Sequence, residues 1–384
     1  MAKCARRARL VEMAGCGAAF LPLDSASCAV VRFNRPTVSS GGLGMYNPDR
    51  SGITTIKDVA LKADVSIATV SRVLNGSRYV SPDLRERVMD AMQSLGYQPN
   101  AIAQGLRRQA THSVGLLVPR INEPFFAQFA FALEKTLFSS GYRTLVCSTE
   151  ENPDKEREYV TMLLSQQVDA VVAFPAIAGT DENIARLVER GVPMVVVERQ
   201  LAGFEVSKVL VTNFQGAYDA VRHLIELGHR RIGVICASVE NIPPDRLDGA
   251  RQALMESRVD ADIRVVDCLP DFKTGYDVAL DMLRGQPRPT AIFALTDSMA
   301  VGVLHAAAEL GLRVPADLSI VGFDDIPLVS FLIPPLTTIA QPTYAMGESA
   351  ARILLEQLEG DDAGPQTVLL ETALIRRAST APPG

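Results

Sequence analysis

Residues 55–76 read TIKDVALKADVSIATVSRVLNG, and this stretch decides which domain lies near the N-terminus. Its apolar residues recur at helical spacing and predict a first helix with the stripe Ile56, Val59, Ala60 and Ala63. Asp64-Val65 then turns the chain, and Ser66 is a good N-cap for a second helix that runs to about Leu74. The pattern predicts two short helices joined by a tight turn.

A third helix follows over about 82–95. Ser81-Pro82 supplies an N-cap and a proline at the first helical position, and Gly96 ends the helix. Its predicted buried face consists of Val88, Met89, Met92 and Leu95. In a helix-turn-helix of this kind the second helix can lie in the major groove of DNA.

The start of the second helix carries the candidate base contacts. Ile67, Ala68 and Thr69 would face base edges, and Ser71 and Arg72 follow one turn later. Arginine can donate two hydrogen bonds to guanine, while Ile67 and Ala68 can offer apolar contact to a thymine methyl group. The alternative is a plain helical hairpin with an exposed arginine.

Charge distribution favours the DNA-binding interpretation. The formal net charge is −6, yet residues 51–110 hold eight Lys or Arg residues against five Asp or Glu residues. A small basic module on a large acidic body is typical of a protein that touches phosphates with one end.

The same residues resemble the lactose/galactose-repressor family. The resemblance rests on TIKDVA (55–60), ADVSIATVSRVLNG (63–76) and GYQPNAIAQGL (96–106), and it continues to about residue 378. It implies that the following residues contact DNA: Thr55, Ser66, Ile67, Ala68, Thr69, Ser71, Arg72, Asn75, Asn100, Ala103 and Leu106. It also implies a hinge in which Leu106 wedges into the minor groove. A two-turn helix capped by Asn100 and containing Gly105 is marginal alone, so it would order against DNA and its twin. The alternative for Leu106 is an ordinary linker residue.

From about Ser113 short apolar runs alternate with helical patterns such as 216–227 and 298–310. The strand-like runs are 114–118, 144–147, 170–174, 194–197, 208–211, 232–236, 291–294 and 319–321. So many strand-helix units predict an α/β fold with parallel doubly wound sheets in two lobes. The resemblance makes this body similar to periplasmic binding proteins.

The expected domain organisation follows the resemblance. It comprises a disordered extension (1–53), the helix-turn-helix domain (54–98), a hinge (99–111), a first lobe (112–211 and 342–362) and a second lobe (212–341 and 363–379). Three crossings between the lobes would make a hinged clamp that closes on a ligand.

Ligands of such sheets bind beyond the carboxyl ends of the strands. Candidate effector-binding residues there are Phe125, Phe126, Arg199, Thr296 and Asp297, and the resemblance implies the same role for Arg246, Phe272 and Asp324. Each also has a structural interpretation, for example as a core aromatic or a helix cap. The aromatic, Arg and Asp set favours a sugar or related metabolite, although purine-like ligands use the same pocket in the family. Thr212-Asn213 departs from the Asp-Asn often found in the family at the first crossing.

Other classes of protein fit less well. An enzyme that binds nucleotides would need a glycine cradle, whereas the first strand leads into PRINEP (119–124), so we expect no enzyme and no cofactor. An exported solute receptor would need a signal peptide and no basic head. Cys147, Cys236 and Cys268 read as buried reduced thiols, so we expect no metal site. A regulator that answers to a protein co-effector, as catabolite-control proteins do, stays open.

The expected partners are a pseudo-palindromic operator, a small-molecule effector and further copies of the chain, as a homodimer or a dimer of dimers. A cytoplasmic location at the bacterial nucleoid is expected, with no membrane partner.

Overall fold

In this computed structural model the structure describes residues 54–75, 79–97, 110–175, 182–199, 203–237, 243–266, 268–360 and 364–384. The expected extension and most of the hinge, with Asn100, Ala103 and Leu106, lie outside the described residues. The expectations for those positions therefore stay predictions.

The head consists of the helices α1 (Ile56–Lys62), α2 (Ile67–Asn75) and α3 (Pro82–Leu95). Their mutual packing buries a small core in which Val59, Val70 and Val88 are fully buried. The Arg87 guanidinium of α3 donates to the carbonyl of Ala63 at 2.6 Å, and so ties α3 to the turn between α1 and α2. Gly96 ends α3 with φ 58°, a left-handed conformation that glycine adopts without strain.

The predicted burial of one residue of the head is wrong. Met89 is 53% exposed, and Ala91 is buried in its place. The inward face of α3 therefore passes through Val88, Ala91 and Met92, which follow the three- and four-residue spacing of a helix face.

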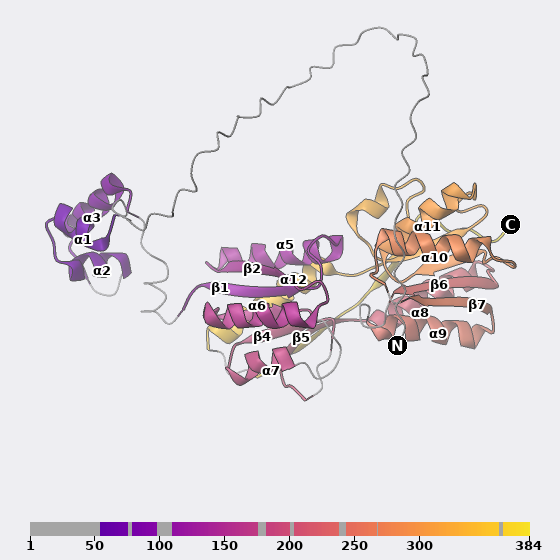
Figure 1. The fold of residues 1–384 in the computed structure, drawn as a ribbon, viewed down its shortest axis with the longest axis horizontal. Helices are drawn as coiled ribbons and strands as arrows, with labels where there is room; N and C mark the ends of the chain where they lie inside the picture. The colour runs from indigo at the N-terminus through magenta and orange to yellow at the C-terminus, as the bar shows by residue number, and fades with distance from the viewer. Residues whose placement is uncertain are drawn as a thin grey trace, which may run out of the picture.

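The first lobe is a parallel sheet of six strands in the order β11-β5-β4-β3-β1-β2. Its strands are β1 (Ser113–Val118), β2 (Arg143–Ser148), β3 (Ala170–Ala173), β4 (Met194–Val197), β5 (Ser207–Val211) and β11 (Thr367–Leu370). The helices α5 (Pro124–Ser139) and α12 (Thr343–Leu358) cover one face, and α6 (Pro153–Ser165) and α7 (Glu182–Glu189) cover the other (Figure 1). Leu116 packs against the first pair of helices and Leu117 against the second, as strand alternation requires.

The second lobe repeats this order as β12-β10-β9-β8-β6-β7. Its strands are β6 (Arg231–Ala237), β7 (Asp260–Val266), β8 (Ala291–Ala294), β9 (Ser319–Asp324), β10 (Thr337–Ala340) and β12 (Ala373–Ile375). Its helices are α8 (Asn213–Glu226), α9 (Pro244–Ser257), α10 (Phe272–Arg284), α11 (Asp297–Glu309) and the short 3-10 helix η1 (Pro327–Ser330). The edge strand β12 runs antiparallel to β10, whereas the other pairings in this sheet are parallel.

The division between the lobes differs from expectation at one boundary. Residues 363–379 were expected in the second lobe, but β11 pairs in parallel with β5 of the first lobe. The chain then enters the second lobe through Thr372 and forms β12. The third crossing therefore lies near residues 371–372, because an open edge beside β5 is completed by β11 first.

Two of the three expected buried thiols are confirmed. Cys147 and Cys236 are buried, and burial raises the pKa of each thiol, to about 11 and about 12 respectively. Cys268 is exposed, so its expected burial is wrong. It follows β7 at the edge of the second sheet, where an apolar run does not imply a covered strand.

Candidate functional site in the head and the cleft

The outward face of α2 consists of the residues that do not pack into the head core. Val70 and Val73 point into the head core, which turns Ile67, Ala68 and Arg72 outward. Ile67 is 45% exposed although it is a large apolar side chain. An exposed isoleucine at the start of α2 and an exposed arginine in its last turn both suit contact with base edges.

Ser66 positions the beginning of this face. Its hydroxyl accepts a hydrogen bond from the backbone N–H of Thr69 at 3.1 Å and lies 2.9 Å from the Thr69 hydroxyl. The cap satisfies a backbone donor that the first turn of a helix leaves unpaired. Ser66 and Thr69 are thus preorganised at the point where a nucleic acid would approach, and the first turn of α2 carries no acidic residue.

Thr55 holds the start of α1 in a similar way. Its backbone N–H and its hydroxyl both donate to the Asp58 carboxylate at 2.7 Å. These bonds, led by that of the Thr55 side chain, lower the pKa of Asp58. The exposed Thr55 therefore belongs to a fixed cap. Ser71 is half-buried, and the side chain of Asn75 lies outside the described residues.

The second cluster of functional side chains lies between the two lobes. A cavity there is lined by Arg120, Glu123, Phe125, Phe126, Glu198, Pro243, Arg246, Pro270, Thr296 and Asp324. These residues lie at the ends of strands or in the loops and helix starts that follow them, since the carboxyl ends of parallel strands meet at the same edge of each sheet. The volume of the cavity is only about 40 Å³, far below the roughly 300–1,000 Å³ of small-molecule sites.

Arg246 of α9 is the centre of this cleft and is 3% exposed. Its guanidinium donates to Asn213 Oδ1 at 2.7 Å, to the Leu295 carbonyl at 3.0 Å and to Asp324 Oδ1 at 3.1 Å. It also donates to Glu198 Oε1 of the first lobe at 3.2 Å. The guanidinium carbon lies 3.9 Å from the centre of the Phe323 ring, a cation–π contact.

Two polar contacts close the cleft directly. The Arg246–Glu198 ion pair is one, and the bond donated by the Ser298 hydroxyl to Glu123 Oε2 at 2.8 Å is the other. Each joins a group of the first lobe to a group of the second. Because these contacts fill the space, a ligand larger than water must open the lobes or replace the contacts.

Asp324 ends β9 and lies opposite Arg246. Its carboxylate also accepts a hydrogen bond from Gln341 Nε2 at 2.8 Å. Burial raises the pKa of Asp324 to about 7, although Arg246 and Gln341 oppose that shift. Burial likewise raises the pKa of Glu123 and of Glu151 above their ordinary values. The cleft thus concentrates acidic groups whose charge is costly.

The structure brings five of the eight candidate effector residues to this cavity. They are Phe125, Phe126, Arg246, Thr296 and Asp324. Phe125 and Phe126 start α5 and stack edge-to-face with each other and with Phe174. Thr296 caps α11 by accepting a bond from Met299 N, so it has a structural task as well.

The other three candidates lie apart from the cavity lining. Asp297 is fully buried, and its carboxylate accepts from Thr338 Oγ1 at 2.6 Å and from Ile326 N at 2.9 Å. It therefore stabilises the loop after β9, as a cap would. Phe272 is 44% exposed at the start of α10. Arg199 is half-buried, and its charge lowers the pKa of Glu151 against the larger effect of burial.

Several residues of the cleft were missed. Arg120 is 8% exposed and lies 3.4 Å from Glu151, and Glu198 pairs with Arg246. Within the described residues, Arg120 Nε, Glu151 Oε2 and Gln341 Oε1 are buried without a hydrogen-bond partner. The signal was available, since Arg120 and Glu123 lie in the segment between β1 and α5, and Glu198 directly follows β4. Charged residues after a strand usually lie in solvent-exposed turns. For that reason these three residues were not predicted to lie in the cleft.

Thr212 and Asn213, where the sequence departs from the family pattern, do not line the cavity. The Thr212 hydroxyl lies 3.0 Å from the Thr372 hydroxyl and accepts a bond from Thr372 N. This links the first crossing to the third. Asn213 orients Arg246 through the 2.7 Å bond, so the pair shapes the cleft from behind its wall.

Comparison with known proteins identifies the family. The profile of bacterial regulatory proteins of the lacI family matches residues 55–100, and that of a periplasmic binding protein-like domain matches residues 221–380. The HTH-type transcriptional repressor PurR of Proteus mirabilis is 37% identical over 335 residues, which cover 86% of this chain and 97% of the relative. The chain belongs to the lacI family.

Further relatives of this lacI-family chain support the same assignment. The ribose operon repressor of Haemophilus influenzae is 34% identical, with 85% of this chain and 98% of the relative covered. The crystal structure of the lac repressor dimer bound to operator and the anti-inducer ONPF matches with a TM-score of 0.77 and 28% identity, covering 86% of this chain and 99% of that one.

The lacI-family chain is a DNA-binding transcriptional repressor with an effector-binding body, and it is not an enzyme. The expected fold class, an α/β body of two parallel-sheet lobes with a helical head, is confirmed. Among the described helices, none has the length and apolar character needed to cross a membrane.

Proposed function

We propose that this repressor binds a pseudo-palindromic operator as a homodimer, and that a hydroxylated small molecule in the cleft controls its operator affinity. The observation that carries the proposal is the buried Arg246, which joins Asp324 of one lobe to Glu198 of the other. A group in that position senses whether the lobes are together or apart.

In the head, Arg72 is the proposed direct base reader. Its exposure at the outer face of α2, with Ile67 and Ala68 beside it, matches the geometry of a recognition helix. Thr69 would face base edges beside Ile67 and Ala68, whereas Ser66 and Thr55 would contact phosphate from their capped positions, together with Ser71 and Asn75. In the hinge, we propose minor-groove contacts for Asn100 and Ala103, with Leu106 as the wedge.

Exposed apolar side chains support a homodimer. Phe131 and Phe138 of α5 are 62% and 55% exposed, and Phe331 and Ile333 of the second lobe are 81% and 99% exposed. Large apolar groups in such positions commonly mark surfaces that another chain covers. A symmetric dimer presents two heads, which requires half-sites related by the same symmetry. Assembly into a dimer of dimers is compatible with this arrangement.

The lining of the cleft favours a neutral ligand with several hydroxyl groups. Glu123, Glu198 and Asp324 supply acceptors, while Arg120 and Arg246 supply donors. Three carboxylates against two guanidinium groups disfavour an anionic ligand. The half-buried Phe126 offers a ring on which the apolar face of a sugar can stack. A relative that is a ribose operon repressor supports this class.

Control of DNA binding would follow from the spacing of the lobes. The first lobe begins at Ser113, directly after the expected hinge, so a change in how the lobes meet can alter the separation of two hinges in a dimer. A ligand can shift operator affinity only by its preference between the two states of the body. Acting on an operator, the repressor works at the bacterial nucleoid in the cytoplasm.

A thermal-shift screen against sugars, polyols and nucleobases tests the ligand assignment. We expect at least one hydroxylated compound to raise the melting temperature, because a ligand of the folded state stabilises it by mass action. Nucleobases as the sole hits would contradict the ligand class. A screen without hits, combined with binding of a phosphocarrier-type protein, would favour a protein co-effector instead.

Affinity for the cleft ligand should depend on pH through Asp324. As pH falls through about 7, this carboxyl gains a proton and loses its value as an acceptor for ligand hydroxyls. We expect calorimetric affinity to weaken by up to about tenfold per pH unit below that value, and Asp324→Asn to flatten the profile. Equal wild-type affinity at pH 8 and pH 6 would contradict this role.

The raised pKa of Asp324 has the opposite effect on the pH dependence of folding stability. The raised pKa means that the folded chain holds this proton more tightly than the unfolded chain does. The Asp324 contribution to the free energy of unfolding therefore falls as pH rises from the ordinary value of 3.8 to about 7. Melting curves at each pH separate this effect from ligand affinity.

A further inference from the structure

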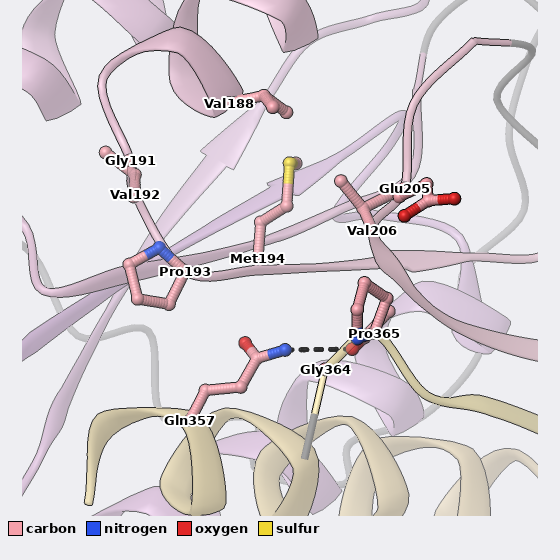
Figure 2. Close-up of a pocket in the computed structure, with 11 residues that line it drawn as sticks. Val188, Gly191, Val192, Pro193, Met194, Glu205, Val206, Gln357, Gly364 and Pro365 are labelled. Carbon is pink, nitrogen blue, oxygen red and sulfur yellow. Dashed lines mark hydrogen bonds between the residues drawn. The ribbon is translucent and has the colours of Figure 1, made fainter. Parts of the chain in front are cut away.

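A larger cavity lies at the other end of the first lobe's sheet. Its volume is about 410 Å³, within the roughly 300–1,000 Å³ range of small-molecule sites, whereas the cleft retains about 40 Å³. It is lined by Val188, Gly191, Val192, Pro193, Met194, Glu205, Val206, Ser207, Gln357, Gly364 and Pro365. The residues come from α7, the starts of β4 and β5, α12 and the segment before β11 (Figure 2).

This cavity is separate from the cleft. Met194 begins β4, and Glu198 of the cleft follows its end, so the strand places the two about 13 Å apart at roughly 3.3 Å per residue. The parallel register aligns the starts of β1, β3, β4 and β5 along one edge. The cavity therefore opens at the edge of the sheet where the chain enters from the hinge.

One buried polar atom of a residue that lines the cavity has no hydrogen-bond partner within the described residues. The side-chain amide of Gln357 donates through Nε2 to Ser207 Oγ at 2.8 Å, and the same oxygen accepts from Gln366 N at 3.0 Å. Gln357 Oε1 is buried and accepts no hydrogen bond within the described residues. Figure 2 shows this oxygen on the side of Gln357 that faces Pro193.

The chemistry of the lining defines what could fill the space. Val188, Val192, Met194 and Val206 are apolar, and the two prolines add further apolar surface. Buried polar groups in folded proteins nearly always have partners, and the lining of this cavity combines polar and apolar surface. Glu205 is exposed and lines the same cavity, so an anion would meet a like charge there.

We propose that this cavity is a second small-molecule site, and that it takes an uncharged cyclic molecule with one N–H or O–H donor for Gln357 Oε1. The ring would pack among the valines, Met194 and the prolines. The donor would fix its orientation. Such a site is independent of the hydroxylated ligand of the cleft, which needs several donors and acceptors.

Indole is a suitable probe, because it is a neutral ring with one N–H donor. The chain contains no tryptophan, so the fluorescence of indole can be followed directly without a protein background of the same chromophore. We expect saturable binding of indole to the full chain. Its matched analogue 1-methylindole lacks the donor and should bind about five- to tenfold more weakly, as expected for the loss of one hydrogen bond.

Substitutions in and away from the cavity test where indole binds. Val188→Phe would fill the cavity from α7 and should abolish indole binding, while Val265→Phe adds the same ring at a 45% exposed position of the second lobe and should leave it unchanged. Gln357→Leu should bring the affinity for indole down to that for 1-methylindole. Gln357→Glu keeps an acceptor and should retain the preference for indole.

The measurements distinguish loss of indole binding from loss of folding. Circular dichroism melting curves identify variants that fold, and Gln357→Leu carries the test if Val188→Phe does not fold. Undiminished binding by a folded Val188→Phe would overturn the proposal, since indole would then lie elsewhere. Equal affinity of the wild-type chain for the two probes, or no saturable binding, would overturn it as well.

Discussion

Arg246→Ala is expected to weaken binding of the cleft ligand at least about thirtyfold. Removal of one partner from a buried, hydrogen-bonded charge pair typically costs about 2–5 kcal/mol. In this chain the loss would leave Glu198 and Asp324 facing each other without the guanidinium that joins them. Isothermal titration calorimetry with the ligand found in the screen measures the effect.

The variant has a predictable cost in stability. Arg246 holds four acceptors, including the Leu295 carbonyl and Asn213, so its loss should lower the melting temperature. Arg246→Lys keeps the charge but not the forked geometry, and should recover part of the stability with little of the affinity.

Both variants are expected to bind operator DNA nearly as the wild-type chain does without ligand, at temperatures where they are folded. Undiminished ligand affinity in Arg246→Ala would show that the cleft is not the effector site. Loss of operator binding by a folded variant would assign Arg246 to the structural frame.

Arg72→Ala should cost about 1–3 kcal/mol on the cognate operator for each half-site and relax the preference at one base pair there. The reason is the loss of a two-pronged hydrogen bond from an exposed guanidinium at the outer face of α2. Competition binding to operators with single base changes measures both effects.

Arg85→Ala is the matched control, because Arg85 is an equally charged, exposed residue of α3. It should weaken binding to all sequences alike, if at all, and reduce the salt dependence. A loss that is uniform over sequences in Arg72→Ala would make Arg72 a phosphate contact.

The buried central strands were the most predictable part of the fold. The central strands β4 and β8 lie where the apolar runs predict them, because strands covered on both faces are continuously apolar. The apolar runs did not locate the strands β7, β10, β11 and β12. The first, third and fourth are sheet edges with exposed or half-buried positions, and β10 begins with two threonines that hydrogen-bond within the core.

The location of the site was more predictable than the side-chain contacts within it. The family resemblance located Arg246 and Asp324, and both lie on the side of the sheet where the carboxyl ends of the strands meet. Which side chain turns inward depends on local partners. Asp297 turns to Thr338 and the backbone of Ile326, and Glu198, which sequence reasoning left out, turns to Arg246. Such choices rest on long-range packing that no local pattern records.

The central claim is that a ligand in the cleft controls the head. Its most direct test is the fluorescence anisotropy of a labelled operator titrated with the full chain, with and without saturating cleft ligand. The account predicts that the ligand changes operator affinity by about 1–3 kcal/mol, or roughly five- to 150-fold. Equal operator affinity in the two titrations, with calorimetry showing the cleft occupied, would contradict it.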